Sequence, residues 1–280
     1  MKELLTLKHI SKSFNNKEVL KNISFSIPKG SIFAFLGPNG SGKSTLLHII
    51  MQILTPSQGI VTMNNQQVKK DKIGFVFQEN TLDEELTVYE NLYIRGRLYK
   101  IPKQKLKQKI KELSTYLGMK EFIDKKYKIC SGGQKRISMI ARALLMDPEI
   151  IIMDEPTTAL DIETRKKVWS FLLKLNKEKA MAIFFSSHYI EEAEVATNLC
   201  IIKSGQIIFN GCYQELMKKY SKKKLQIDYK NKEEIKEISS MDKVLHYLEQ
   251  LPWYNIETLS ITNSSLEEIF LKLIHENVNC

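Results

Sequence analysis

The residues with the clearest chemistry form a glycine-rich stretch, which reads Gly-Pro-Asn-Gly-Ser-Gly-Lys-Ser-Thr from Gly37 to Thr45. This stretch fits the pattern G-x-x-x-x-G-K-[S/T] of a phosphate-binding loop. Lys43 would reach the β- and γ-phosphates of a nucleotide, and the Ser44 hydroxyl would bind Mg²⁺. We therefore predict a nucleotide cradle made by Gly37, Pro38, Asn39, Gly40, Ser41, Gly42, Lys43, Ser44 and Thr45.

The segments beside this loop have the context that such a motif requires. The run from Ser31 to Leu36 is apolar and has the length of a buried strand. Beyond the loop, apolar residues recur at helical spacing at Leu46, Leu47, Ile49, Ile50 and Ile53. Glycines at 37, 40 and 42 allow backbone angles that other residues avoid, so successive N–H groups can point at a phosphate beside the helix N-terminus.

Two adjacent carboxylates form the second chemical group. Asp154 and Glu155 directly follow the apolar run from Ile150 to Met153, which reads as a buried strand. Asp154 can hold Mg²⁺ through its water shell, and Glu155 can polarise a water molecule for attack on the γ-phosphate. The alternative, two acids in an ordinary loop, is disfavoured by the buried strand that precedes them.

Polar residues also follow two other predicted strands. Gln78 ends the strand from Lys72 to Phe77, where it could reach the Mg²⁺ or the attacking water. Taken alone, this glutamine is more often a simple polar strand end. His188 follows the strand from Ala180 to Phe185 and could sense the γ-phosphate, because ligands of open α/β sheets bind at the carboxyl ends of strands.

A second potential phosphate site lies at Ser131 to Gln134. Its sequence, Ser-Gly-Gly-Gln, precedes a helical pattern, so Ser131 is expected at the N-cap and the two glycines in the first turn. Because glycine is costly inside a helix, this pair indicates close approach by a ligand or a backbone segment. One nucleotide does not easily need both cradles of one chain, which favours a dimer that shares ATP across its interface.

The elements that position these residues alternate along the chain. Strands at Leu4–Ile10 and Val19–Ile27, joined by a turn over residues 12–17, predict an antiparallel sheet ahead of the loop. Strands interleaved with helices follow and predict a mainly parallel sheet with right-handed crossovers. From Leu86 onward the pattern becomes helical. Phe14 is either a platform for an adenine ring or a core residue.

Composition describes an ordinary globular protein. The 280 residues are 43% hydrophobic and 26% charged, and no apolar run approaches the ~20 residues of a membrane span. No signal peptide is expected, because no long apolar region follows Met1-Lys2-Glu3. The four cysteines lack metal-ligand spacing, which fits a reducing cytosol.

The net charge of +10 has two readings. Nucleic acid, an acidic membrane or nucleotide could balance it, or the lysines could simply form a solvated surface. The densest lysines lie opposite an apolar stripe (Leu106, Ile110, Leu113 and Leu117), and such a basic amphipathic helix could also face lipid or a partner. These lysines are Lys100, Lys103, Lys105, Lys107, Lys109 and Lys111.

The composition shifts near Tyr220, where a basic segment from Lys218 to Lys224 reads as a linker. The tail beyond it reads as a strand over 225–229, charged segments, a strand over 253–261 and an amphipathic helix from Ser264 or Ser265. We predict one domain over residues 1–215, with a helical part at about 86–146, and a small α+β extension over 216–280.

Together these residues resemble the ATP-binding cassette of ABC transporters over about residues 1–215. The resemblance implies an α/β P-loop fold with an N-terminal antiparallel subdomain and a helical signature subdomain. The matching motifs are Gly37–Thr45 (Walker A), Gln78 (Q-loop), Ser131–Gln134 (signature), Asp154 and Glu155 (Walker B and catalytic glutamate), Thr158–Asp161 (D-loop) and His188 (switch histidine). It also places Phe14 at the adenine-stacking position.

The resemblance implies that Glu155, His188 and Gln78 act in hydrolysis, with ATP and Mg²⁺ bound. Ser44, Gln78 and Asp154 would hold the metal. Two cassettes, expected to be copies of one chain, would close head-to-tail, so that Ser131, Gly132, Gly133, Gln134 and Asp161 also contribute to binding.

One residue departs from the pattern, since the signature usually begins with Leu and here begins with Cys130. Cysteine is small and apolar enough for the fold to survive, although interface packing could weaken and the thiol could be oxidisable. The tail sequence Ser265-Leu-Glu-Glu-Ile-Phe270 is similar to drug-resistance, ABC-2-type exporter ATPases. The region from Gln78 to about Asn91 resembles the part that meets the coupling helix of the membrane subunit.

The expected function is therefore ATP hydrolysis that powers export through a separate membrane permease, at the cytoplasmic face of the membrane. A second hypothesis is an ABC-type ATPase that acts on nucleic acid or the ribosome, which the charge of +10 motivates. Relatives of that kind carry long coiled coils or two cassettes, so no nucleic-acid partner is expected. A third hypothesis is a regulatory or force-transmitting cassette whose membrane partner moves no solute.

Overall fold

The computed structural model describes residues 2–158, 160–187, 190–229, 232–238, 247–249 and 255–275. The chain divides into two compact units, Met1–Asn210 and Gly211–Cys280. Our predicted boundary at residue 215 falls inside helix α6 (Tyr213–Tyr220), whereas the division in the structure precedes this helix because α6 packs against α8 (Leu266–His275). Within the described ranges, no helix combines the length and apolarity needed to cross a lipid bilayer.

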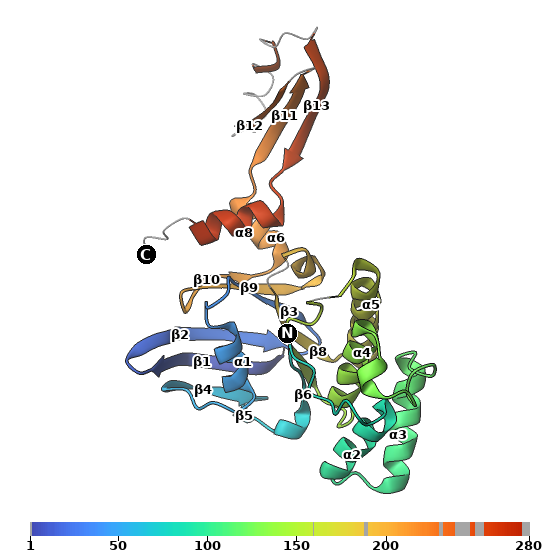
Figure 1. Ribbon diagram of the computed structural model, residues 1–280. Coiled ribbons are helices and arrows are strands. Elements are labelled where there is room, and N and C mark those ends of the chain that lie inside the picture. The colour runs from blue at the N-terminus through green and yellow to red at the C-terminus, as the bar shows by residue number, and fades with distance from the viewer. Residues whose placement is uncertain are drawn as a thin grey trace. The chain divides into compact units, whose positions relative to one another are not determined.

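Figure 1 shows the strands and helices of both units, which follow one another along the chain in groups. The strands are β1 (Glu3–Phe14), β2 (Lys17–Pro28), β3 (Ile32–Leu36), β4 (Gln58–Met63), β5 (Gln66–Gln67), β6 (Ile73–Val76), β7 (Ile150–Asp154), β8 (Ala182–Ser187), β9 (Asn198–Lys203), β10 (Gln206–Gly211), β11 (Lys223–Tyr229), β12 (Lys232–Ile238) and β13 (Ile256–Asn263). The remaining α-helices are α1 (Lys43–Ile50), α2 (Val88–Leu98), α3 (Lys103–Tyr116), α4 (Gly132–Ala143) and α5 (Ile162–Lys179). Short 3₁₀ helices are η1 (Lys70–Lys72), η2 (Tyr127–Ile129) and η3 (Ile190–Val195).

A six-stranded sheet positions the functional residues. Its strand order is β10-β9-β3-β8-β7-β6, and β3 pairs in parallel with both β8 and β9. The pairs β7–β8 and β6–β7 are also parallel. The predicted mainly parallel sheet is therefore confirmed. Because parallel strands end at the same edge, the residues that follow β3, β6, β7 and β8 gather there.

The predicted antiparallel sheet is present as β2-β1-β4-β5. The turn predicted over residues 12–17 is shorter than expected, because β1 continues to Phe14, β2 begins at Lys17, and only Asn15 and Asn16 remain between the strands. Both asparagines have positive φ angles, 44° and 65°, as a tight hairpin turn requires. The polar sequence around Lys12 concealed this strand extension, which lies on the solvent side.

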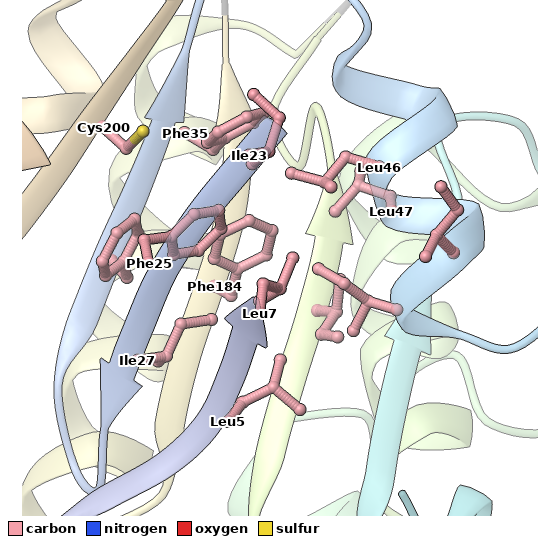
Figure 2. Packing of buried hydrophobic residues seen from close by; sticks show 14 of the residues in the cluster. Leu5, Leu7, Ile23, Phe25, Ile27, Phe35, Leu46, Leu47, Phe184 and Cys200 are labelled. Atoms are coloured by element: carbon pink, nitrogen blue, oxygen red, sulfur yellow. The ribbon is translucent and has the colours of Figure 1, made fainter. Parts of the chain in front are cut away.

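The main core of the first unit lies between the two sheets, with α1 packed into it (Figure 2). Phe25 of β2 stacks on Phe33 of the parallel sheet, with ring centroids 5.2 Å apart. It also lies 5.8 Å from the Phe35 ring and 6.1 Å from the Phe184 ring. Leu46 and Leu47 of α1 complete the cluster (Figure 2). Residues of α1 and of β3 belong to this one core, which therefore fixes the helix relative to the strand that precedes it.

Helices α2, α3 and α4 form the predicted helical part (Figure 1). Thr87 caps α2 with a reciprocal pair of hydrogen bonds to Glu90. Helices α2 and α3 touch closely at Gly96, where an added Cβ would lie 2.2 Å from a Leu106 methyl group. The apolar stripe of α3 is buried as predicted, and the lysines at 103, 105, 107 and 111 are exposed.

The second unit contains the three-stranded sheet β12-β11-β13 and helices α6 and α8. The strand over 225–229 and the helix after Ser265 are confirmed. The predicted strand over 253–261 begins at Ile256 in the structure, and Trp253 lies outside the described residues. We missed β12, because its charged sequence Lys-Glu-Glu-Ile-Lys-Glu-Ile reads as loop, and such charge is typical of edge strands.

Candidate functional site

The glycine-rich loop joins β3 to α1, as its sequence predicts. Gly40 and Gly42 have positive φ angles of 76° and 109°. Gly37 is required for a different reason than we expected, since its φ angle is not positive but a Cβ there would lie 2.5 Å from the Ile202 carbonyl oxygen. No side chain caps the N-terminus of α1, so its first amide groups face the loop.

Lys43 is buried in this loop. Its ammonium group donates hydrogen bonds to the carbonyl oxygens of Gly37 at 2.7 Å and Pro38 at 3.1 Å. Burial lowers the pKa of Lys43, and the nearby Glu155 and Asp154 carboxylates partly offset this effect. A buried cation beside the N-terminus of α1, which no side chain caps, suits a polyanionic ligand better than it suits water.

The two carboxylates lie at the end of β7, as predicted. Asp154 accepts a hydrogen bond from the Ser186 hydroxyl at 2.5 Å. The Glu155 N–H group donates to the Ser186 side-chain oxygen at 3.1 Å and to the Ser186 carbonyl at 3.2 Å. Ser186 therefore holds both acids. We missed it, although a serine at the end of a parallel strand is a signal that points to the site.

Glu155 is also held through its side chain. The Gln78 amide donates to the Glu155 carboxylate at 3.1 Å, and the Thr158 hydroxyl donates to the same oxygen at 3.0 Å. The Glu155 backbone has a φ angle of 47°, which is costly for a residue with a side chain. Such a conformation persists only where the surroundings impose it.

These groups surround one cavity of about 580 Å³. Its walls bring together residues that are far apart in the sequence, and most of them are predicted site residues. The lining is Val19, Asn39, Gly40, Gly42, Lys43, Ser44, Thr45, Gln78, Glu155 and Thr158. The cavity is large enough for a nucleotide triphosphate chain and its metal.

Three observations test whether a nucleotide with Mg²⁺ fits here. The Ser41 hydroxyl, inside the loop, is buried without a hydrogen-bond partner among the described residues. Ser44 and Gln78, two of the predicted Mg²⁺ ligands, face the cavity. No cluster of three or more His, Cys, Asp or Glu residues occurs in the described part of the chain, so a metal here would also need oxygens from a ligand. The residues fit a nucleotide-bound magnesium ion.

The second predicted cradle lies apart from this cavity. Ser131 is the N-cap of α4, as predicted: its hydroxyl accepts from the Gln134 N–H at 3.3 Å, and the Gln134 side chain accepts from the Ser131 N–H at 3.1 Å. The cavity lining includes none of the Ser131–Gln134 segment, Asp161 or Phe14. Phe14 is 44% exposed, with Lys12 over its ring, so it is not a core residue.

The two glycines of α4 differ. A Cβ on Gly133 would lie 2.3 Å from a Thr164 methyl group, whereas one on Gly132 would make ordinary contact with Leu160 at 3.5 Å. Thus the close approach that we predicted at this pair comes at Gly133 from a side chain of α5. Asp161 caps α5 through Thr164, which lowers the Asp161 pKa.

Cys130 is buried and its Sγ lies 3.5 Å from the Lys126 carbonyl oxygen. Burial raises the pKa of this thiol, so it stays protonated at neutral pH. This environment opposes the idea of an oxidisable thiol. His188, the predicted phosphate sensor, lies outside the described residues.

Two buried charged residues near the site escaped sequence reasoning. Arg136 donates hydrogen bonds to carbonyl oxygens of the chain around Glu155. Glu192 accepts hydrogen bonds from Thr157, from Ser187 at 2.7 Å and from Trp169 at 3.4 Å. It stands beside Glu191 and therefore reads as part of a solvated acidic run, although it is buried.

Comparisons with known proteins agree with this geometry. Residues 20–158 match the family model described as ABC transporter. The chain is 36% identical to the ABC transporter ATP-binding protein NatA of Bacillus subtilis, over 76% of this chain and 91% of that protein. It is 35% identical to the Nod factor export ATP-binding protein I of Rhizobium meliloti, over 74% and 64% of the two chains. It is 36% identical to the linearmycin resistance ATP-binding protein LnrL of Bacillus subtilis, over 76% and 70%.

Solved structures of ATP-binding cassettes are also similar to this chain. The fold is similar to that of cbiO1 from Clostridium perfringens, part of the ABC transporter complex cbiONQ, with a TM-score of 0.71, 27% identity and coverage of 78% of this chain and 94% of that one. It is also similar to a dimeric ATP-binding cassette bound to ADP and Pi, with a TM-score of 0.67, 30% identity and coverage of 75% and 98%.

Proposed function

Because this chain belongs to the ABC transporter family, as an ATP-binding protein, we propose that it hydrolyses ATP to power solute export through a separate membrane-spanning permease of the ABC-2 type. Relatives named for Nod factor export and linearmycin resistance support export as the purpose. The observation that carries the proposal is the single cavity in which Lys43, Gln78 and Glu155 meet.

Each residue has a distinct task in this cavity. The loop amides and Lys43 would bind the β- and γ-phosphates of ATP. Ser44, Gln78 and Asp154 would hold Mg²⁺, which when bound neutralises charge on the phosphates. Glu155, held by Gln78 and Thr158, would orient and polarise the attacking water. His188 would contact the γ-phosphate.

The second cradle would act on a nucleotide bound by another copy. Ser131 lies at the exposed N-terminus of α4, away from the cavity of its own chain. We propose a head-to-tail homodimer in which the Ser131–Gln134 segment and Asp161 of one copy close over ATP held by Lys43 of the other. A similar cassette forms a dimer with bound ADP and Pi, which supports this arrangement.

A groove of about 500 Å³ offers a docking place for the permease. Its lining includes Phe75 of β6 and Phe77 just after this strand, together with Arg95 of α2 and Tyr99 just after this helix. The groove adjoins the region from Gln78 to Asn91 that resembles the contact with a coupling helix. A permease that docks here would place this chain at the cytoplasmic face of the membrane, as a peripheral subunit.

Two measurements test the proposal. The purified full-length chain should hydrolyse ATP only with Mg²⁺, and Glu155→Gln should abolish turnover. In cells that lack this chain, the wild type should restore resistance to at least one compound of a panel of amphipathic antibiotics and peptides, and Glu155→Gln should not. Equal restoration by both variants would show that hydrolysis does not power the process.

A further inference from the structure

Arg136 lies on α4, in the second turn after Ser131, and it is only 6% exposed. Its guanidinium group donates hydrogen bonds to main-chain carbonyl oxygens of two separate segments. One is Phe77, at 2.5 Å, directly before Gln78. The other segment carries the predicted catalytic Glu155, and its acceptors are the carbonyl oxygens of Asp154, at 3.3 Å, Glu155 and Pro156. One side chain thus joins three elements of the site.

These carbonyl groups need a partner because they lie where strands end. Strand β6 ends at Val76 and β7 ends at Asp154, so the next carbonyls have no continuing sheet ladder. A buried carbonyl without a donor is costly, and a charged donor makes a stronger hydrogen bond than a neutral one. Burial lowers the pKa of Arg136 to about 10, so the group stays cationic at neutral pH.

The contact lies at a strained backbone segment. Glu155 adopts a φ angle of 47°, and Arg136 binds the carbonyl oxygens on both sides of the Glu155–Pro156 peptide bond. Such a conformation is kept only by surrounding contacts. The same guanidinium fixes Phe77, so it sets the spacing between the Gln78 and Glu155 segments, whose side chains meet at 3.1 Å.

We propose that Arg136 is a positioning residue for ATP hydrolysis, which locks the Gln78 and Glu155 segments in register and ties both to the helix that Ser131 begins. Arg136 acts through Glu155 and does not touch the nucleotide cradle of its own chain. This inference rests on the proposed ATPase function. It assigns a mechanical role to a residue outside the loop, carboxylate and Ser131–Gln134 motifs.

Arginine is needed because the task requires several donors in one plane. A lysine at 136 would retain the charge, but all its donors sit on one nitrogen and lack the planar arrangement of the guanidinium group. Arg136→Lys therefore tests geometry with little change in charge. The variant Arg136→Gln, which is neutral and donates from one amide, provides a second test if the lysine variant is poorly folded.

The chain offers a matched control in Arg142. This residue is on the same helix, is 8% exposed, and has its pKa lowered by burial. It also donates to β6, at the Phe75 carbonyl, 2.9 Å away, and to the Thr81 hydroxyl at 2.7 Å. Within the described residues, its hydrogen bonds do not extend to the chain around Glu155. Arg142→Lys therefore reports the cost of disturbing a buried arginine of α4 in general.

The experiment compares full-length wild type, Arg136→Lys, Arg136→Gln and Arg142→Lys. We would measure Mg²⁺-ATPase kcat and KM, the affinity for a fluorescent ATP analogue without turnover, and the thermal unfolding midpoint. A misplacement of about 1 Å at a reacting group costs on the order of 100-fold in rate. We expect kcat to fall on the order of 100-fold in both Arg136 variants, while KM and analogue affinity change less than about threefold. Arg142→Lys should keep kcat within about threefold.

The possible results distinguish failure of the role of Arg136 from failure of the proposed ATPase function. If the wild type hydrolyses ATP and both Arg136 variants keep their kcat, the inference is wrong while the ATPase function stands. An equal loss of kcat in Arg142→Lys, or a parallel loss of analogue affinity in the Arg136 variants, would show a general structural role and would also reject it. If the wild type itself shows no hydrolysis, the proposed function fails first.

Discussion

The side-chain amide of Gln78 donates a hydrogen bond to the Glu155 carboxylate at 3.1 Å, although 77 positions separate the two residues in the chain. Gln78 follows β6 and Glu155 follows β7, and these two strands are parallel neighbours. The pairing therefore brings a metal-binding candidate and a water-activating candidate to one point. Gln78 holds the carboxylate by one hydrogen bond from a neutral amide, which can exchange when a ligand enters.

Glu155→Gln should separate binding from turnover. The amide keeps the size of the side chain but cannot act as a base, so we expect kcat to fall on the order of 100-fold or more, with nucleotide affinity retained. Steady-state hydrolysis and titration with a fluorescent ATP analogue check this. Glu112→Gln, an exposed carboxylate of α3, is the matched control and should change neither quantity. An unchanged kcat in Glu155→Gln would refute the assigned role.

Lys43→Ala should act on binding itself. Lys43 is the buried cation of the loop, and its loss removes the charge that faces the β- and γ-phosphates. We expect ATP affinity to fall at least about tenfold, since hydrogen bonds between charged groups are worth ~1.5–3 kcal/mol. Isothermal titration with ATP and Mg²⁺ measures the change. Lys177→Ala, at an exposed position of α5, should bind like the wild type. Intact affinity in Lys43→Ala would overturn the nucleotide site.

Gly133→Ala should destabilise the fold through overpacking. The new methyl group would lie 2.3 Å from a Thr164 methyl, so α4 or α5 must shift. We expect a loss of ~1–3 kcal/mol in the free energy of unfolding. Gly132→Ala is the matched control, because its methyl would meet Leu160 at an ordinary 3.5 Å. Urea unfolding of both variants compares them. Equal stability of the two would show that the contact between α4 and α5 is not tight.

The sheet edge could be predicted from the sequence because its signals are local. Gly37, Asp154 and Gln78 each follow an apolar run of strand length, and parallel strands end at one edge. The structure adds that β6 and β7 are neighbours, which brings Gln78 within hydrogen-bond distance of Glu155. For that reason, the cavity lining contains most of the predicted loop residues together with Gln78 and Glu155.

Arg136 and Glu192 could not be predicted in the same way. The partners of Arg136 depend on how α4 docks against the ends of β6 and β7, which no local pattern encodes. One clue exists: Arg136 stands four residues before the buried Ile140, on the apolar side of its helix. A buried charge on such a face requires partners. Glu192 offers no such clue, because its neighbour Glu191 makes it look solvated.

The cap of α5 predicts how stability depends on pH. The Asp161 pKa is lowered below 3.8 by hydrogen bonds from Thr164. A carboxylate whose pKa is lower in the folded state than in the unfolded state stabilises the fold at pH values above the unfolded-state pKa. This stabilisation is lost as the pH falls through the folded-state pKa. The difference in unfolding midpoint between the wild type and Asp161→Ala should thus be constant from about pH 8 to 5 and shrink below about pH 4. Urea unfolding across this range measures it. A difference that does not change with pH would contradict the ionised cap.

Cys130 supplies the last prediction, since it replaces the usual leucine of the Ser131–Gln134 motif with a buried thiol. Burial raises its pKa, and a protonated, enclosed thiol reacts slowly. We expect alkylation by iodoacetamide at pH 7.5 to label the half-buried Cys212 well before Cys130, as mass spectrometry of the native protein would show. In urea, both should react at similar rates.

Cys130→Leu should leave ATPase activity within about twofold of the wild type, because leucine is also apolar. Rapid native labelling of Cys130, with loss of ATPase activity, would instead identify an exposed thiol at the dimer interface and would restore the redox hypothesis that burial opposes.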